Sequence, residues 1–196
     1  MAEPAAPRAW QRMLSGRRLD LLDPSPLDIE IEDVALGLSR VARWNGQTSG
    51  AHGFSVAQHS LLVLDILEAT TERPSRALRR AALLHDASEF VTADLITPFK
   101  IIIGDAYKAL ENRIQAAVHL RFDLPAHLKD DWTRAIKRAD RDSAFLEAVE
   151  LAGFTEEEAR RIFKFRRARR NEPLTSWPAE EARQRFLDRF RSVAET

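Results

Sequence analysis

The 196-residue sequence contains no cysteine. Disulfide bonds and thiolate metal sites are therefore excluded, and the composition suits a reducing compartment, so we expect a cytoplasmic protein. Lysine plus arginine number 30, and aspartate plus glutamate also number 30, which gives a formal net charge of zero. This balance provides no global electrostatic field that would draw the chain to nucleic acid or to an anionic membrane.

Long apolar runs are also missing. None approaches the roughly 18 residues that a membrane span needs, and the N-terminal residues lack the apolar core of a signal peptide, so we expect neither feature. The seven glycines and nine prolines are few, and helix-forming residues dominate. The length is sufficient for one domain with a sizeable core. These observations predict an all-α protein with an irregular lead-in at residues 1–27 and one helical domain at residues 28–196 that includes the C-terminal helices.

Apolar residues recur at helical spacing along much of the chain. Ser55 with Gln58, and Thr155 with Glu158, have the spacing of capping boxes that begin helices. Residues 45–54 should form a glycine-rich loop, and Thr97-Pro98 should break any helix. The first expected helix begins at about Ile31 and stops by Asn45-Gly46. The others run from Ser55 to about Ala69, from Pro74-Ser75 to the region of Glu89, from about Gly104 to Phe122, from Asp130 to Val149 and from Pro178 to Val193.

The stretch around His85 and Asp86 carries the strongest chemical signal. An apolar helix ends there in a cluster of ionisable residues, and Glu89 lies about one helical turn beyond His85. Buried imidazole and carboxylate groups cost free energy unless a partner satisfies them. A His–Asp hydrogen bond is one solution, and a divalent metal ion, for which both groups are standard ligands, is the other.

Two more polar residues are expected to face the interior. His59 shares an apolar helical face, where a histidine is usually a hydrogen-bonded core residue. Asp140 has apolar residues one turn before and after it, and a buried carboxylate there needs a strong partner. A salt bridge to Arg138 or Arg141 would satisfy Asp140 without any metal.

The order of these motifs resembles the HD-domain metal-dependent phosphohydrolase superfamily. Within it, four segments look like the bacterial 5'-deoxynucleotidases: Arg43-Trp44, residues 55–60, residues 85–89 and residues 94–100. The resemblance runs from about residue 28 to about residue 150. It implies that the domain at residues 28–196 is an HD-domain helical bundle.

The resemblance also implies a metal site. His59, His85, Asp86 and Asp140 match the ligand positions of the family and would hold one divalent ion, with Co, Mn, Zn, Fe and Mg all open. Glu89 would orient or deprotonate the attacking water, or protonate the leaving oxygen.

Four further residues match the pocket of the family: Arg43, Trp44 and Lys100 as substrate-binding residues, and Asp94 as a second catalytic residue besides Glu89. Arg43 and Trp44 would contact the phosphate and the sugar or base, and Asp94 the sugar or the attacking water. The residues by themselves allow simpler interpretations: a surface arginine beside a core tryptophan, an Asx cap at Asp94 and a solvated first-turn lysine at Lys100.

Together these features predict a hydrolase that removes phosphate from a deoxyribonucleoside 5'-monophosphate. Two alternatives stay open: a dATP-type triphosphohydrolase that releases tripolyphosphate, and a non-catalytic HD-like signalling or binding module. The expected partner is a small deoxyribonucleotide rather than a membrane or nucleic acid, and a homodimer is left open. Residues 160–170 carry seven lysines and arginines, which indicates a solvated helix face, with nucleotide phosphates or nucleic acid as other uses.

Overall fold

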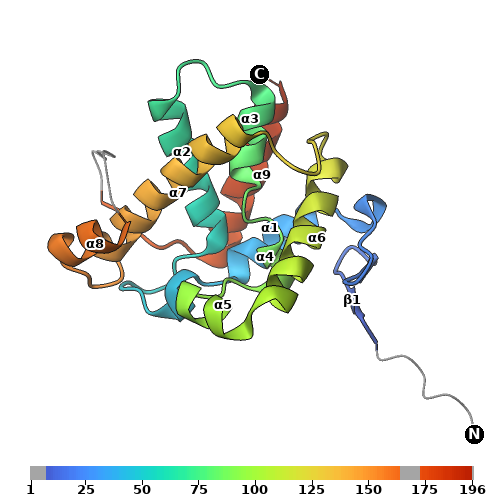
Figure 1. Cartoon of the computed structure of the whole chain (residues 1–196), viewed down its shortest axis with the longest axis horizontal. Coiled ribbons are helices and arrows are strands. Elements are labelled where there is room, and N and C mark those ends of the chain that lie inside the picture. Colours follow the sequence, from blue (N-terminus) through green and yellow to red (C-terminus); the bar gives the residue numbers. More distant parts are fainter. Residues whose placement is uncertain (1–7, 164–172, 196) are drawn as a thin grey trace, which may run out of the picture.

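The computed structural model describes residues 8–163 and 173–195. Within these ranges helices dominate, and one small two-stranded sheet accompanies them, so the fold is the all-α helical bundle that the sequence predicts (Figure 1). The helices are η1 (Pro26–Asp28), α1 (Ile31–Arg40), η2 (Arg43–Gly46), α2 (Val56–Thr70), α3 (Arg76–Leu83), α4 (Glu89–Thr92), α5 (Thr97–Ile103), α6 (Asp105–Arg121), α7 (Asp130–Glu150), α8 (Glu156–Phe163) and α9 (Ala179–Glu195). Most of the basic stretch at residues 160–170 lies outside the described residues.

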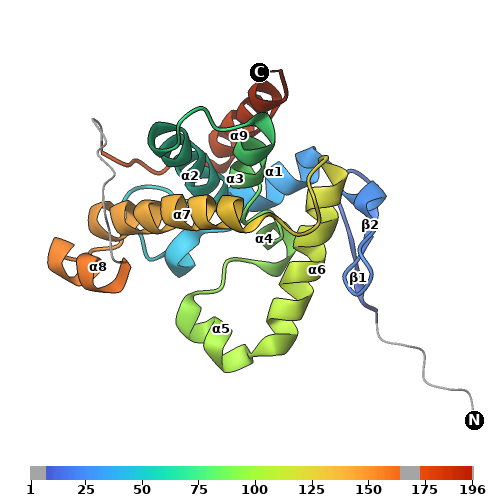
Figure 2. The same ribbon diagram turned by 45° about the horizontal axis from the view of Figure 1, so that its top comes forward.

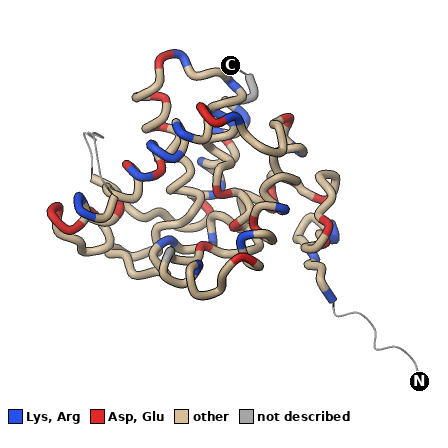
Figure 3. Tube along the Cα trace, in the orientation of Figure 1, with Lys and Arg blue, Asp and Glu red and all other residues tan. Residues whose placement is uncertain are grey.

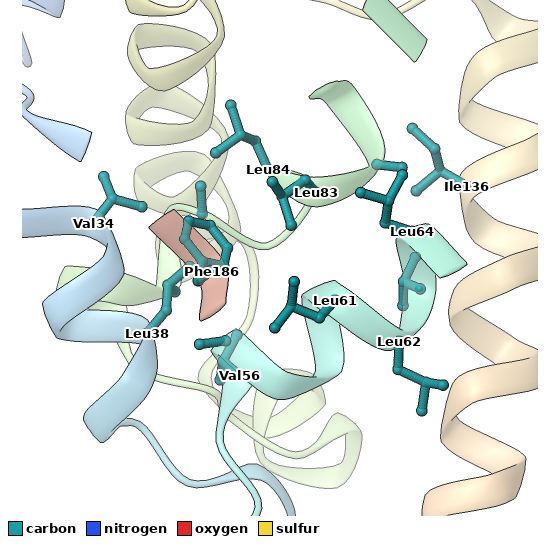
Figure 4. Packing of buried hydrophobic residues seen from close by; sticks show 14 of the residues in the cluster. Val34, Leu38, Val56, Leu61, Leu62, Leu64, Leu83, Leu84, Ile136 and Phe186 are labelled. Carbon is teal, nitrogen blue, oxygen red and sulfur yellow. The ribbon is translucent and has the colours of Figure 1, made fainter. Parts of the chain in front are cut away.

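Helix α2 forms the centre of the bundle. It is apolar on almost every side, which is typical of a fully buried helix, and it contacts α1, α3, α7 and α9 (Figures 1 and 2). Figure 4 shows Leu61, Leu62 and Leu64 of α2 among apolar side chains of the surrounding helices, such as Leu83 and Phe186. His59 lies on the same helix. The packing that buries α2 therefore also fixes the position of its histidine.

The N-terminal lead-in is more regular than the sequence indicates. Strands β1 (Trp10–Arg12) and β2 (Arg18–Asp20) pair as an antiparallel hairpin beside α6 (Figure 2). Leu19 is fully buried in the core, and the guanidinium groups of Arg8 and Arg18 lie 4.2 and 4.3 Å from the centroid of the Trp10 ring. Strands this short carry no readable alternation, so contacts with the rest of the protein decide their conformation.

No described helix continues through Thr97-Pro98, as predicted, but the sequence analysis did not expect helix α5, which begins there with Pro98 in its first turn. The first N–H groups of a helix have no intrahelical acceptor, so a proline at the start costs no hydrogen bond. The chain around His85 also differs from the expectation of one helix. Helix α3 ends at Leu83 and α4 begins at Glu89, with short-range backbone bonds in the turn between them.

The two capping motifs behave differently. Thr155 and Glu158 form a complete capping box, in which the backbone N–H of each residue donates to the side chain of the other. Ser55 accepts from the backbone N–H of Gln58 as predicted, at 3.3 Å. The Gln58 amide instead donates to the carbonyl of Thr175 and accepts from the backbone N–H of Trp177, and so ties the segment before α9 to α2.

Basic and acidic residues are interspersed along the described helices (Figure 3). Among the described residues, no helix has the length and apolar character to cross a membrane.

Candidate metal centre

Four side chains from three parts of the fold converge on one point. His59 belongs to α2, His85 and Asp86 to the turn between α3 and α4, and Asp140 to α7. Nε2 of His59 lies 3.3 Å from Nε2 of His85, 3.2 Å from Oδ1 of Asp140 and 3.5 Å from Oδ2 of Asp86. Nε2 of His85 lies 3.1 Å from Oδ2 of Asp86. Residues that are distant in the sequence are therefore neighbours in the fold.

The hydrogen bonds of the two histidines orient their rings. Nδ1 of His59 lies 2.6 Å from Oε1 of Glu147, and Nδ1 of His85 lies 2.9 Å from the carbonyl oxygen of Ala82. Because both partners are acceptors, each Nδ1 carries the proton, and each neutral ring then presents the lone pair of Nε2 to the other. Two lone pairs and two carboxylates facing one another repel unless protons or a cation lie among them. A set of two imidazoles and two carboxylates therefore fits a divalent metal ion.

Electrostatics favours positive charge at this centre. Burial and the Arg43 guanidinium oppose protonation of His59, but nearby carboxylates, with Glu147 the strongest, outweigh them and raise the pKa of His59 well above its ordinary value. Burial alone would raise the pKa of Asp86, yet His85 and His59 hold that pKa well below its usual range. Burial is likewise outweighed at Asp140, where His59 lowers the pKa. The aspartates are therefore ionised and attract a cation.

Glu89 is a buried carboxyl group beside this centre. Its Oε1 lies 3.6 Å from Nζ of Lys100, while its Oε2 has no hydrogen-bond partner among the described residues. Burial, together with the charges of Asp86 and Asp94, raises the pKa of Glu89 to about 10. Without a further cation, Glu89 is thus protonated at neutral pH and has a proton to donate.

Lys100 is not the solvated first-turn lysine that the residues by themselves favour. Its Nζ lies 3.1 Å from Oε1 of Glu111 as well as near Glu89, and its side chain is half-buried. Burial lowers the pKa of Lys100, but Glu89 and Glu111 outweigh this effect and raise it to about 12. Lys100 therefore stays charged and links α5 to the candidate site.

Arg43 is likewise not a surface arginine. Its side chain is only 14% exposed; Nη1 donates to Oδ2 of Asp94 at 3.1 Å, and Nε donates to Oε2 of Glu147 at 3.2 Å. The contact of the Asp94 side chain is thus an ion pair rather than the Asx cap that the sequence left open. Trp44 Nε1 donates to the same Oε2 at 2.9 Å, although Trp44 has a φ of 57°, in the left-handed region that non-glycine residues seldom adopt. Such strain is typical of functional sites.

Glu147 is the residue of this cluster that the sequence analysis missed. It is fully buried on α7 and contacts both His59 and Arg43. It lies about two helical turns after Asp140, and therefore on the same face of the helix, which was the available signal. Glutamates are almost never fully buried unless they are paired, and its partners lie far away in the sequence.

Residues 36–157, more than half of the chain, match the family model described as 5'-deoxynucleotidase YfbR-like. The Rhodobacter capsulatus protein RCAP_rcc00048 is 61% identical over 156 residues, which cover 80% of each chain. YfdR of Escherichia coli K12 is 35% identical over 98 residues, or 50% of this chain and 49% of YfdR. The 5'-deoxynucleotidase PM0747 of Pasteurella multocida is 32% identical over 125 residues, or 56% of this chain and 60% of PM0747.

The matched region includes every residue of the cluster described above. The family model matches more than half of the chain, and the Rhodobacter capsulatus protein is highly identical over most of both chains. The chain belongs to the YfbR-like 5'-deoxynucleotidase family of HD-domain hydrolases.

Proposed function

We propose that the protein is a metal-dependent phosphohydrolase that converts a deoxyribonucleoside 5'-monophosphate and water to a deoxynucleoside and orthophosphate. The observation that carries this proposal is the convergence of His59, His85, Asp86 and Asp140, with the buried Glu89 beside them. Membership in a 5'-deoxynucleotidase family supports the same reaction.

The four converging residues would hold one divalent ion through Nε2 of the histidines and the carboxylate oxygens of the aspartates. When bound, such an ion supplies Lewis acidity towards a phosphoryl oxygen and towards a water molecule. The Nδ1 hydrogen bonds of His59 and His85 keep both rings in the orientation that this binding needs.

Glu89 would act as the general acid and general base of the reaction. Attack of a water oxygen on phosphorus breaks the bond to the 5'-oxygen of the sugar, and that oxygen leaves as an alcohol only if it gains a proton. A carboxyl group with a raised pKa is suited to supply this proton, and it regains one from the attacking water, so no net proton transfer to Glu89 remains.

The remaining residues would bind the substrate. Arg43 is held by Asp94 and Glu147, so its charge has a fixed position next to the carboxylate cluster and is suited to neutralise a phosphate. Lys100 would add a second positive charge from α5. Trp44 would contact the sugar or base, and Asp94 the sugar or the attacking water.

Product analysis with dAMP and dATP tests the proposal. The purified chain is incubated with each nucleotide and with Co²⁺, Mn²⁺, Zn²⁺, Fe²⁺ or Mg²⁺, and the phosphorus products are separated. We expect orthophosphate from dAMP, and loss of that product with a chelator. Tripolyphosphate from dATP, with dAMP untouched, would favour the triphosphohydrolase, and no hydrolysis under any condition would favour a binding module.

A further inference from the structure

We infer that Glu147 is a positioning residue that holds the candidate metal centre and Arg43 in one geometry, each through a different oxygen of the same carboxylate. The inference deepens the proposed function, because it rests on the metal site proposed there. Glu147 itself contacts neither the point where Nε2 of His59 and His85 meet nor any reacting atom, so its role is indirect.

The Oε1 atom of Glu147 orients a proposed metal ligand. It accepts a hydrogen bond from Nδ1 of His59 at 2.6 Å and another from Oγ of Ser143 at 2.7 Å. An acceptor at this position fixes the proton on Nδ1 and the direction of the ring, so that the lone pair of Nε2 points to the centre. Outer partners of this kind typically change metal affinity by about 10–100-fold when they are removed.

The Oε2 atom of Glu147 contacts the proposed substrate-binding residues. It accepts from Nε of Arg43 at 3.2 Å and from Nε1 of Trp44 at 2.9 Å. Two donors therefore meet each oxygen, and the carboxylate is fully buried. A rotation of Glu147 that loosened one side would also break the bonds of the other side, which makes the two halves of the site interdependent.

A glutamine cannot reproduce this arrangement, although it has the same shape. An amide has one oxygen and one NH₂ group, so in either orientation the NH₂ group faces two donors. The Ser143 hydroxyl can rotate to accept from an NH₂ group, but Nδ1–H of His59 and the N–H groups of Arg43 and Trp44 cannot. The Glu147→Gln substitution must therefore release either His59 or the pair Arg43 and Trp44. A purely structural ion pair would predict something different: lower stability, with metal and phosphate binding unchanged.

The test uses the full chain and two probes, Co²⁺ alone and orthophosphate added to the Co²⁺-loaded protein. Calorimetry measures both affinities, and the visible absorption of bound Co²⁺ reports the ligand geometry. Glu68→Gln is the matched control, since Glu68 is a paired glutamate of α2 whose partners are Arg79 and Arg189. We expect Glu147→Gln to weaken Co²⁺ binding about 10–100-fold with a changed spectrum, or to keep Co²⁺ and lose orthophosphate affinity by a similar factor.

Glu68→Gln should lower the melting temperature and change neither affinity. A folded Glu147→Gln variant with wild-type affinities and spectrum would overturn the inference. If that variant does not fold, Ser143→Ala and Trp44→Phe each remove one donor from one oxygen. Ser143→Ala should then change the Co²⁺ spectrum, and Trp44→Phe should weaken orthophosphate binding. An unchanged spectrum in Ser143→Ala together with unchanged orthophosphate affinity in Trp44→Phe would overturn the inference.

Hydrolysis is not a readout of this experiment. A chain that hydrolyses no nucleotide would overturn the proposed function, while a Co²⁺ affinity that depends on Glu147 would still support the inference. A chain that does not bind Co²⁺ at all would overturn both.

Discussion

Nε2 of His59 in α2 lies 3.2 Å from Oδ1 of Asp140 in α7. These two helices pack directly against each other, and both contribute apolar side chains to the core. The side chain of Asp140 keeps 38% of its surface exposed. The bundle thus provides a rigid frame with an accessible ligand, as a functional site needs.

Asp140→Asn should remove metal from the protein without unfolding it. The substitution keeps the shape of the side chain and removes one of the two negative charges that Asp86 and Asp140 give to the proposed ligand set. The loss of metal affinity should exceed the about 10–100-fold that follows removal of a residue that only hydrogen-bonds to a ligand. Elemental analysis after dialysis against Co²⁺ measures the loss, with Asp142→Asn on the same helix as the control. Full metal occupancy in Asp140→Asn would argue against its assignment as a ligand.

Glu89→Gln should keep the metal and lose turnover. Its amide cannot donate an acidic proton, so we expect kcat to fall by about 10²–10⁴-fold, the usual contribution of a general acid or base. Steady-state kinetics with dAMP and metal analysis on the same samples check this. Glu111→Gln removes the other carboxylate that pairs with Lys100 and should have a much smaller effect. Equal losses of kcat in Glu89→Gln and Glu111→Gln would show that the loss comes from the disturbed pairing of Lys100 and not from Glu89.

Arg43→Ala should destabilise the fold as well as impair activity. The buried carboxylate of Glu147 would lose its cationic partner, and breaking a buried pair costs about 3–5 kcal/mol. Urea denaturation measures this loss. Arg43→Lys keeps the charge but not the two-sided fork, so it should retain more stability while KM rises; an unaltered KM would remove Arg43 from the substrate site.

Gly37→Ala should destabilise the protein even though alanine favours helices. A Cβ atom at position 37 of α1 would lie 2.7 Å from both Cβ and the carbonyl oxygen of Phe90 in α4. The gain in helix propensity is about 0.5–1 kcal/mol, and the backbone clash outweighs it. Because Phe90 adjoins Glu89, we also expect a lower kcat. A melting temperature and kcat equal to the wild type would show that α4 shifts freely.

His119 should make the protein less stable in mild acid. Its Nδ1 donates to the carbonyl of Ala126 and its Nε2 accepts from the side-chain amide of Gln115. Protonation of Nε2 would place its N–H opposite the N–H of Gln115 and break that hydrogen bond. Burial outweighs the hydrogen bond to Ala126 and lowers the pKa of His119. The unfolded chain therefore binds the proton more readily, and stability falls as pH drops through the unfolded value of about 6.5 towards the lower folded value.

Urea denaturation of the wild type and of His119→Gln at several pH values between 7 and 5 measures this contribution. The free energy of unfolding of the wild type should fall more steeply with decreasing pH than that of the variant. Parallel curves would show that His119 does not contribute.

Local patterns in the sequence predict the helices because local interactions form them. Apolar periodicity and the serine cap at Ser55 located the start of α1 and both ends of α2, α6 and α7 to within about two residues. The same reasoning placed a helix boundary at Thr97-Pro98 but did not predict α5, since a proline that ends one helix can also begin another. It also could not show that the hairpin at Trp10–Asp20 forms, because three-residue strands depend on what packs against them.

The candidate site divides in the same way. The residue types and their order pointed to His59, His85, Asp86 and Asp140, and the structure brings these side chains together. Glu147 was missed although it lies on the same helical face as Asp140, and the ion pairs of Lys100 were missed as well, since a glutamate or lysine is expected to be exposed unless its partner is known. Their roles stay predictions that the variants above test.

The sequence by itself determined the helical class of the protein and most of the helix starts, because periodicity and caps act over a few residues. It offered His59, His85, Asp86 and Asp140 as candidate ligands through the resemblance of their types and order to the HD-domain family. Only the tertiary structure decided that Glu147 joins His59 to Arg43, that Lys100 is paired and that Glu89 is buried. Hydrogen bonds and burial depend on distances between segments far apart in the chain, and packing of the whole bundle around α2 sets those distances.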